Sequence, residues 1–157
     1  SSAWKAACWA RLENGAKAME NIRYGVRHYT TSSLFSICSN AMQVDGALGM
    51  TAAIAEMLLQ SHQGEIRFLP ALPDSWTTGE VRGFRARGGF ELDFSWDSGR
   101  LQKATILSHA ASTCRLRLDG SFLVMQDGQP VKTTTPENSV IEFGTAPGTR
   151  YSLIRAK

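Results

Sequence analysis

The chain has 157 residues, of which 43% are hydrophobic and 20% charged, a balance typical of a globular protein and unlike that of a disordered one. The net charge of +3 is small, and 17 Lys and Arg are interspersed with 14 Asp and Glu, which argues against a nucleic-acid partner. No apolar run reaches the roughly 18 residues of a membrane helix, so we expect no membrane span. The opening, without Met or signal peptide, predicts a processed product or a piece of something longer.

The residues most often used as metal ligands or in disulfides are few. The chain has three cysteines and three histidines: Cys8, Cys38, Cys114, His28, His62 and His109. They form no CxxC pair and lack the spacing of a zinc site, so we expect neither a metal nor a cofactor. The pattern favours three buried free thiols, although one disulfide with a spare cysteine remains an alternative.

The first part of the chain is predicted to be helical. Residues 3–12 are rich in helix formers and follow a serine that could cap them. After a break at residues 13–15, residues 16–26 give a second helix, so the chain opens as an αα-hairpin. Residues 27–47 are predicted to form a long loop, because their Thr and Ser side chains hydrogen-bond locally, and a structureless run of this length is often functional.

A third helix is predicted over residues 50–61, where apolar side chains recur at helical spacing. Gly64 suits the left-handed position that follows a helix end. His62 is interpreted as a partner of the negative end of the helix dipole. This segment carries the strongest helical pattern in the chain.

After residue 64 the hydrophobic period changes from helical to alternating. The predicted strands are residues 90–96, 101–107, 114–118, 122–124, 140–143 and 151–154. Residues 97–99 provide a turn between the first two strands, and Asp119 with Gly120 predicts a hairpin between the next two. This part is therefore predicted to be antiparallel β, arranged as a sandwich.

Two domains follow from this change of pattern. We predict an α+β chain with a helical segment over residues 1–64 and a β domain over residues 65–157. The Pro-rich residues 69–76 fit neither a helix nor an inner strand. They are interpreted as a connector lying over the junction.

The sharpest cluster of functional candidates is residues 43–49, where the long loop meets the third helix. Asp45 has two interpretations: a helix cap, which the pattern alone favours, or a catalytic acid or base whose ionised form the helix dipole stabilises. Gly46 and Gly49 are costly in a helix's first turns and indicate close approach by a ligand or by another backbone. Gln43 is most simply interpreted as solvated or bonded to backbone, as most such side chains are.

The runs MQVDGALGM at residues 42–50, EIRFLPALPDSW at residues 65–76 and WKAACWARL at residues 4–12 together resemble motifs of glycoside hydrolase family 95, the α-L-fucosidase family. Residues 42–62 resemble the family pattern FQIDGNFG followed by a helix of the form AxIAEMLLQS. Residues 65–76 resemble EIxLLPALPxxW, residues 81–90 resemble VxGLRARGGF, and residues 4–12 match WKxxxWARL. The motifs occur in order over residues 4–107, which is far more specific than one short match.

The resemblance implies the architecture of the parent protein. Residues 1–62 would be the last helices of a catalytic (α/α)6 barrel, followed by an antiparallel, β-sandwich-like C-terminal domain. Three helices cannot close such a barrel, so the upstream part of the same barrel is an expected partner.

The resemblance also implies a reaction and a site. Family members are inverting exo-glycoside hydrolases, in which the aspartate of the DG motif activates an asparagine that helps water attack the anomeric carbon. Asp45 matches that aspartate, and the catalytic acid would lie upstream. Gln43, Ser39 and Gly46 are the expected contacts to an oligosaccharide or glycan substrate, and the family points to an extracellular or secreted protein.

The chain departs from the family pattern in two places. Residues 39–42 read SNAM where the family often has HPPF, and residues 47–48 read AL where the family has NF. Both changes bear on which sugar is accepted, so α-L-galactosides are expected beside α-L-fucosides of plant or host glycans. The alternative function is a non-catalytic carbohydrate-binding or structural β module.

Overall fold

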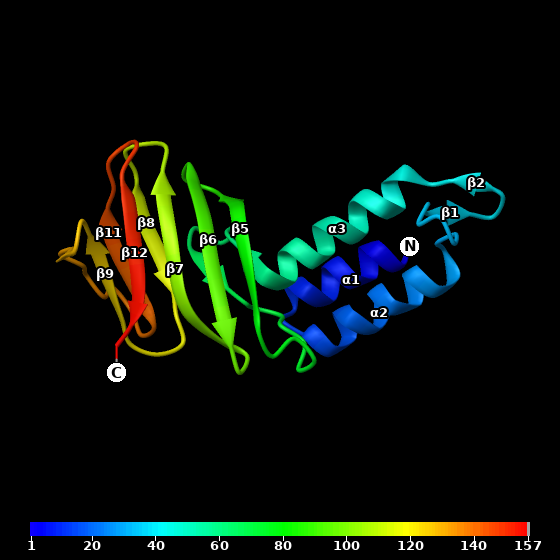
Figure 1. Ribbon diagram of the computed structural model, residues 1–157, viewed down its shortest axis with the longest axis horizontal. Coiled ribbons are helices and arrows are strands. Elements are labelled where there is room, and N and C mark those ends of the chain that lie inside the picture. The colour runs from blue at the N-terminus through cyan, green and yellow to red at the C-terminus, as the bar shows by residue number, and fades with distance from the viewer. Residues whose placement is uncertain (157) are drawn as a thin grey trace. The chain divides into compact units, whose positions relative to one another are not determined.

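The computed structural model describes residues 1–156, which form two compact units (Figure 1). The first, here called the helical unit, comprises Ser1–Leu58 and Leu69–Ser75. The second, the β unit, comprises Leu59–Phe68 and the chain from Trp76 onward. Three helices and mostly antiparallel strands confirm the α+β class, while the domain division at residue 64 stays a prediction. None of the helices within residues 1–156 is long and apolar enough to cross a membrane.

Three helices build the helical unit: α1 (Ser2–Arg11), α2 (Gly15–His28) and α3 (Val44–Leu58). The buried faces of α1 and α3 carry small side chains, among them Ala6, Ala10 and Ala53, each with no exposed surface. Because alanine adds little bulk, the helix backbones can approach closely. Arg11 of α1 also forms a two-point ion pair with Glu56 of α3, with distances of 2.6 Å and 3.0 Å.

The first two predicted helices are confirmed, but their caps differ. α1 follows Ser1, whose side chain makes no capping hydrogen bond, so the predicted serine cap is wrong. α2 begins at Gly15, inside the predicted break, because the Asn14 side chain accepts a hydrogen bond from the backbone N–H of Lys17 at 2.9 Å. This cap satisfies one of the free N–H groups of the first turn.

The predicted loop over residues 27–47 is partly structured. It contains a small hairpin of β1 (Ile37–Cys38) and β2 (Ala41–Met42), with Ser39 in the left-handed region at φ 55°. α3 begins at Val44, six residues before the predicted start. Its early glycines are tolerated because neighbours lie close: a Cβ atom at Gly49 would be 3.1 Å from the Ala3 Cβ.

The predicted end of the third helix is also wrong. α3 ends at Leu58, and the next two residues form β3 (Leu59–Gln60), which pairs antiparallel with β4 (Ile66–Phe68). Gly64 is left-handed as predicted, with φ 81°, but lies in the turn between these strands. His62 lies in the same turn, so it is not a partner of the helix dipole. Sheet pairing and the burial of Leu59 override local helix propensity.

The Pro-rich segment belongs to the helical unit. Leu69 donates its backbone N–H to the carbonyl of Leu58 at 2.8 Å, and Ala71 donates to that of Met57 at 3.1 Å. These bonds satisfy two carbonyls at the end of α3 that lack partners within the helix. A Cβ atom at Gly15 would lie 2.5 Å from the Ala71 carbonyl oxygen, so the segment packs directly on the start of α2.

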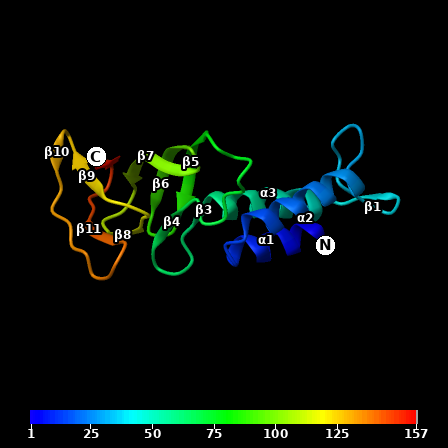
Figure 2. The ribbon, with the colours of Figure 1, turned by 90° about the horizontal axis from the view of Figure 1, so that it is seen from below.

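The β unit holds two sheets (Figure 2). The six-stranded sheet has the order β10-β9-β12-β7-β6-β5, and the four-stranded sheet has the order β11-β8-β4-β3. The remaining strands are β5 (Gly79–Ala86), β6 (Phe90–Asp97), β7 (Arg100–Ser108), β8 (Thr113–Arg117), β9 (Phe122–Gln126), β10 (Gln129–Pro130), β11 (Val140–Gly144) and β12 (Arg150–Arg155). The pairs are antiparallel except β4 with β8, which is parallel.

Aromatic side chains fill the space between the two sheets. Phe68 of β4 meets Phe94 of β6 edge to face, with ring centroids 5.1 Å apart. The rings of Phe143 in β11 and Tyr151 in β12 are tilted against each other, with centroids 5.2 Å apart. Each pair joins strands of different sheets, so the two sheets pack as a sandwich. Along β6 every second side chain is buried, which confirms the predicted alternation.

One predicted hairpin is wrong. β8 pairs with β11 and β4, whereas β9 pairs with β12 and β10. The chain therefore crosses from one sheet to the other at Asp119 and Gly120. Leu118 and Phe122 are both buried, so the turn residues span the gap between two apolar strands that enter the core from opposite sheets.

Candidate functional site

The region around Asp45 is built by the β1–β2 hairpin folding back onto the start of α3. The backbone N–H of Gln43 donates to the carbonyl of Ser36 at 2.7 Å, which closes the hairpin. Ile37 donates in the same way to the carbonyl of Tyr29 at 2.8 Å, and this ties the hairpin to the end of α2. The segment that enters α3 is thus held on both sides by main-chain bonds.

Asp45 lies in the first turn of α3, as its second residue, and its side chain is exposed. It is not the residue that precedes the helix, so the interpretation as a helix cap is wrong. Its Oδ2 accepts a hydrogen bond from Nε2 of Gln43 at 3.2 Å. The free backbone N–H groups of this turn and the helix dipole favour a negative charge here, so the position suits an ionised carboxylate.

Gly46 is required by the packing of the hairpin against α3. A Cβ atom at this position would lie 2.6 Å from Oγ of Ser36 and 3.3 Å from Oε1 of Gln43. The glycine does mark a close approach, but the approaching atoms belong to two side chains and not to a ligand or another backbone. The approaching group is the chain's own hairpin.

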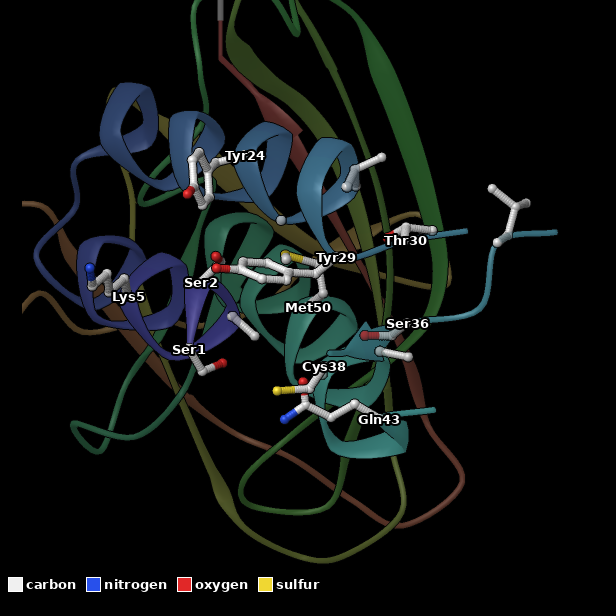
Figure 3. A pocket seen from close by; sticks show the side chains of 16 residues that line it. Ser1, Ser2, Lys5, Tyr24, Tyr29, Thr30, Ser36, Cys38, Gln43 and Met50 are labelled. Atoms are coloured by element: carbon white, nitrogen blue, oxygen red, sulfur yellow. The ribbon is translucent and has the colours of Figure 1, made fainter. Parts of the chain in front are cut away.

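A cavity of about 630 Å³ lies beside this turn, within the helical unit (Figure 3). Gln43 and Gly46 line it, together with residues of α1, of the C-terminal half of α2 and of the hairpin. Asp45 is joined to the cavity through its hydrogen bond to Gln43. The structure thus brings together Gln43, Asp45 and Gly46, whereas Ser39 lies exposed at the hairpin turn and outside the cavity lining.

Sequence reasoning missed three side chains that line the cavity, Tyr24, Tyr29 and Cys38 (Figure 3). The Tyr24 and Tyr29 rings are 6.0 Å apart, edge to face. The neighbouring Tyr24 raises the pKa of the Tyr29 hydroxyl through charge repulsion and hydrogen bonding. A protonated tyrosine hydroxyl can both donate and accept hydrogen bonds, which suits a contact to a sugar hydroxyl. The sequence signal that could have identified Tyr24 and Tyr29 as site residues is their place at the junction of a helix and a polar loop.

The cysteines are free, but they are not all buried. Cys114 is buried in the β unit, Cys8 is half-buried and Cys38 is exposed beside the cavity, so the prediction of buried thiols is confirmed for Cys114 and wrong for the other two. Residues 1–156 contain no group of three or more His, Cys, Asp or Glu side chains placed to hold a metal ion.

Comparison with known proteins places the chain in a family. Residues 1–58 match the catalytic domain of glycosyl hydrolase family 95, and residues 60–153 match the C-terminal domain of the same family. The chain belongs to glycoside hydrolase family 95, which confirms the resemblance drawn from its motifs.

Two known proteins have sequences similar to this chain. The probable alpha-fucosidase A of Aspergillus oryzae is 33% identical over 138 residues, which span 77% of this chain and 19% of that protein. The alpha-L-fucosidase 2 of Arabidopsis thaliana is 37% identical over 128 residues, which span 74% of this chain and 15% of that protein. The chain therefore spans less than a fifth of the length of these relatives.

A solved family 39 glycoside hydrolase from the gut symbiont Bacteroides cellulosilyticus WH2 is also similar, at 12% identity. The match covers 56% of this chain and 18% of that one, with a TM-score of 0.38. Agreement this slight establishes no common fold.

Proposed function

We propose that the chain is the C-terminal part of an inverting exo-glycoside hydrolase that acts on α-L-fucosides. Its helices would be the last ones of an (α/α)6 barrel within residues 1–64, and residues 65–157 would form the accompanying β domain. Family membership supports this, as do the two similar proteins named as fucosidases. The upstream part of the same barrel is the proposed partner.

The surface of the helical unit supports a larger barrel. Most of the large apolar side chains that are exposed in residues 1–156 lie on this unit, including Trp4 at 69% and Leu34 at 81% exposure. Apolar side chains gathered on one unit mark a surface that is covered by another part of a protein. Further helices of the barrel would bury them.

Asp45 is the proposed catalytic residue of this part of the enzyme. The observation that carries the proposal is its place in the first turn of α3, with its carboxylate bonded to Gln43 beside the cavity. In a single displacement with inversion, Asp45 would accept a hydrogen bond from an upstream asparagine and orient it toward the attacking water. A carboxylic acid on the upstream part would protonate the leaving oxygen.

Gln43, Gly46 and Ser39 are the proposed sugar contacts. Gln43 and Gly46 line the cavity, which supports their assignment more directly than that of Ser39 at the hairpin turn. Ala47 also lines the cavity, at a position where the family pattern has asparagine. The smaller side chain leaves room for the additional C6 hydroxyl of galactose, which supports α-L-galactosides as a second substrate class. The proposed natural substrates are extracellular glycans of plant or host origin.

The proposal is tested on the complete protein, by measuring hydrolysis of aryl α-L-fucoside and aryl α-L-galactoside. Asp45→Asn should reduce kcat by about a thousandfold or more, because the neutral amide lacks the negative charge that orients and activates the upstream asparagine. Asp74→Asn, which changes an exposed carboxylate of the same unit away from this cavity, should keep full activity. Equal activity of wild type and Asp45→Asn, with both proteins folded, would contradict the assignment.

The second candidate, a carbohydrate-binding or structural β module, stays a prediction. Such a module needs aromatic side chains exposed on one face to stack on sugar rings. Within the described part of the β unit, the large apolar side chains that are mostly exposed are Leu123 and Ile154, and neither is aromatic. Absence of hydrolysis of every aryl glycoside by the complete wild-type protein would favour this candidate.

A further inference from the structure

We infer that Gln43 is a positioning residue, which holds the Asp45 carboxylate through its amide nitrogen while its amide oxygen stays available to the sugar. The inference rests on the proposed function of Asp45. It assigns the two ends of one amide group to two different tasks. The order of the atoms follows from chemistry: an ionised carboxylate only accepts hydrogen bonds, so the Gln43 atom that faces it is Nε2.

The backbone of Gln43 is fixed before its side chain acts. Its N–H donates to the Ser36 carbonyl at 2.7 Å, and the helix begins at the next residue. The side chain then spans the short distance to Asp45, with Nε2 lying 3.2 Å from Oδ2. Because Gln43 is only half-exposed while Asp45 is exposed, the amide is the more restrained partner and sets the direction of the carboxylate.

Gly46 defines where the other end of the amide lies. Oε1 of Gln43 is 3.3 Å from the position that a Cβ atom at Gly46 would occupy, and both residues line the cavity. Any side chain at position 46 would press on this oxygen. The bare glycine therefore leaves Oε1 free to accept a hydrogen bond from a sugar hydroxyl.

The consequence concerns the second oxygen of Asp45. An exposed aspartate without partners samples several rotamers, and a side chain that must hold an assisting asparagine cannot do so while it rotates. With Oδ2 occupied by Gln43, Oδ1 is the oxygen that remains for the asparagine. A sugar bound at Oε1 also stiffens the amide, so substrate binding and carboxylate orientation are coupled through one side chain.

Gln43→Glu in the complete protein separates the two tasks, because glutamate keeps an acceptor at the cavity but loses the donor and adds a negative charge beside Asp45. We expect kcat to fall about 10- to 100-fold, with KM for the aryl fucoside changed less than about threefold. The acidic limb of the pH–kcat profile should move to higher pH, because the added negative charge beside Asp45 disfavours its charged form. Gln63→Glu, the same change at an exposed turn of the β unit, should leave kcat, KM and the profile as in wild type.

The outcomes separate this inference from the proposed function. If Asp45→Asn abolishes activity but Gln43→Glu raises only KM, with the acidic limb unmoved, Gln43 is a sugar contact alone and the inference fails. If Asp45→Asn stays active, the proposed function itself fails. Should Gln43→Glu not fold, Gln43→Met removes the donor without adding charge, and an unchanged kcat in that variant overturns the inference.

Discussion

The indole ring of Trp96 lies over Gly79, its register partner on the neighbouring strand, so closely that a Cβ atom on the glycine would be 2.2 Å from Cζ2 of the ring. The ring is held there by a hydrogen bond from its Nε1 to the carbonyl of Trp76 at 2.8 Å. Trp96 is buried, and the ring cannot retreat without losing this bond. The first residue of β5 therefore has no room for a side chain beside the Trp96 ring.

Gly79→Ala should therefore destabilise the β unit. The methyl group forces the buried indole aside, and overpacking of this kind costs about 1–3 kcal/mol. The measurement is the free energy of unfolding in guanidinium, followed by tryptophan fluorescence. Gly144→Ala is the matched control, because a Cβ atom at that strand end meets nothing within 4 Å and its free energy should stay within about 0.5 kcal/mol of wild type. Equal values for the two variants would contradict the packing argument.

A methyl group at Gly46 should disturb the site more than the fold. Gly46→Ala adds helix propensity, worth about 0.5–1 kcal/mol, but places a Cβ atom 2.6 Å from the Ser36 hydroxyl and against the Gln43 amide. We expect kcat/KM of the complete protein to fall about tenfold or more while the melting temperature changes little. In the double variant with Ser36→Ala the nearest obstacle is gone, so part of the lost activity should return. A double variant no better than Gly46→Ala would place the obstruction at Gln43.

Cys114 should make stability depend on pH in the alkaline range. Burial raises the pKa of its thiol from 9.0 to about 12, so between these values the unfolded chain loses the proton while the folded chain keeps it. The unfolded state then binds fewer protons, and stability falls as pH rises, by up to about 1.4 kcal/mol per unit. At neutral and acidic pH the Cys114 thiol is protonated in both the folded and the unfolded chain, so it does not make the stability depend on pH.

The check for Cys114 compares wild type with Cys114→Ala, by chemical unfolding at about pH 8 and about pH 10. Other groups titrate in this range in both proteins, so only the difference between their slopes reports on the thiol. Wild type should lose about 1 kcal/mol more than the variant over the interval. Parallel slopes would show that the thiol ionises in the folded protein as easily as in the unfolded one.

The sequence predicted element types better than their ends. Alternation along β6 and helical spacing in α3 are properties of a single segment, so they can be recognised without knowing the neighbours. The end of α3 at Leu58 cannot be recognised in this way, because it depends on the pairing of Leu59 and Gln60 with a strand that begins eight residues after the helix ends. The hairpin predicted at Gly120 is wrong for the same reason. Two strands that belong to opposite sheets have the same local pattern as two strands of one hairpin.

Residues of the candidate site could be predicted from the sequence only where they lie close together along the chain. Asp45, Gly46 and Gln43 are close in sequence, and both the glycine pattern and the family motif pointed to them. Tyr24 and Cys38 reach the same cavity from the second helix and from the hairpin, and no spacing rule connects them to Asp45. Ser39 was included because it lies near the motif in sequence, but the hairpin turns it away from the cavity lining.

The position of β12 has a consequence for how this chain is made. Arg150–Arg155 is the last strand in sequence, yet it lies inside the six-stranded sheet, between β9 and β7. Before this strand has been made, the facing edges of β9 and β7 have no partner, and such edges can pair with other chains. A nascent or prematurely terminated chain that lacks β12 would therefore be prone to aggregation and accessible to chaperones and proteases. The backbone edges of β9 and β7 are paired only after β12 has been added to the sheet.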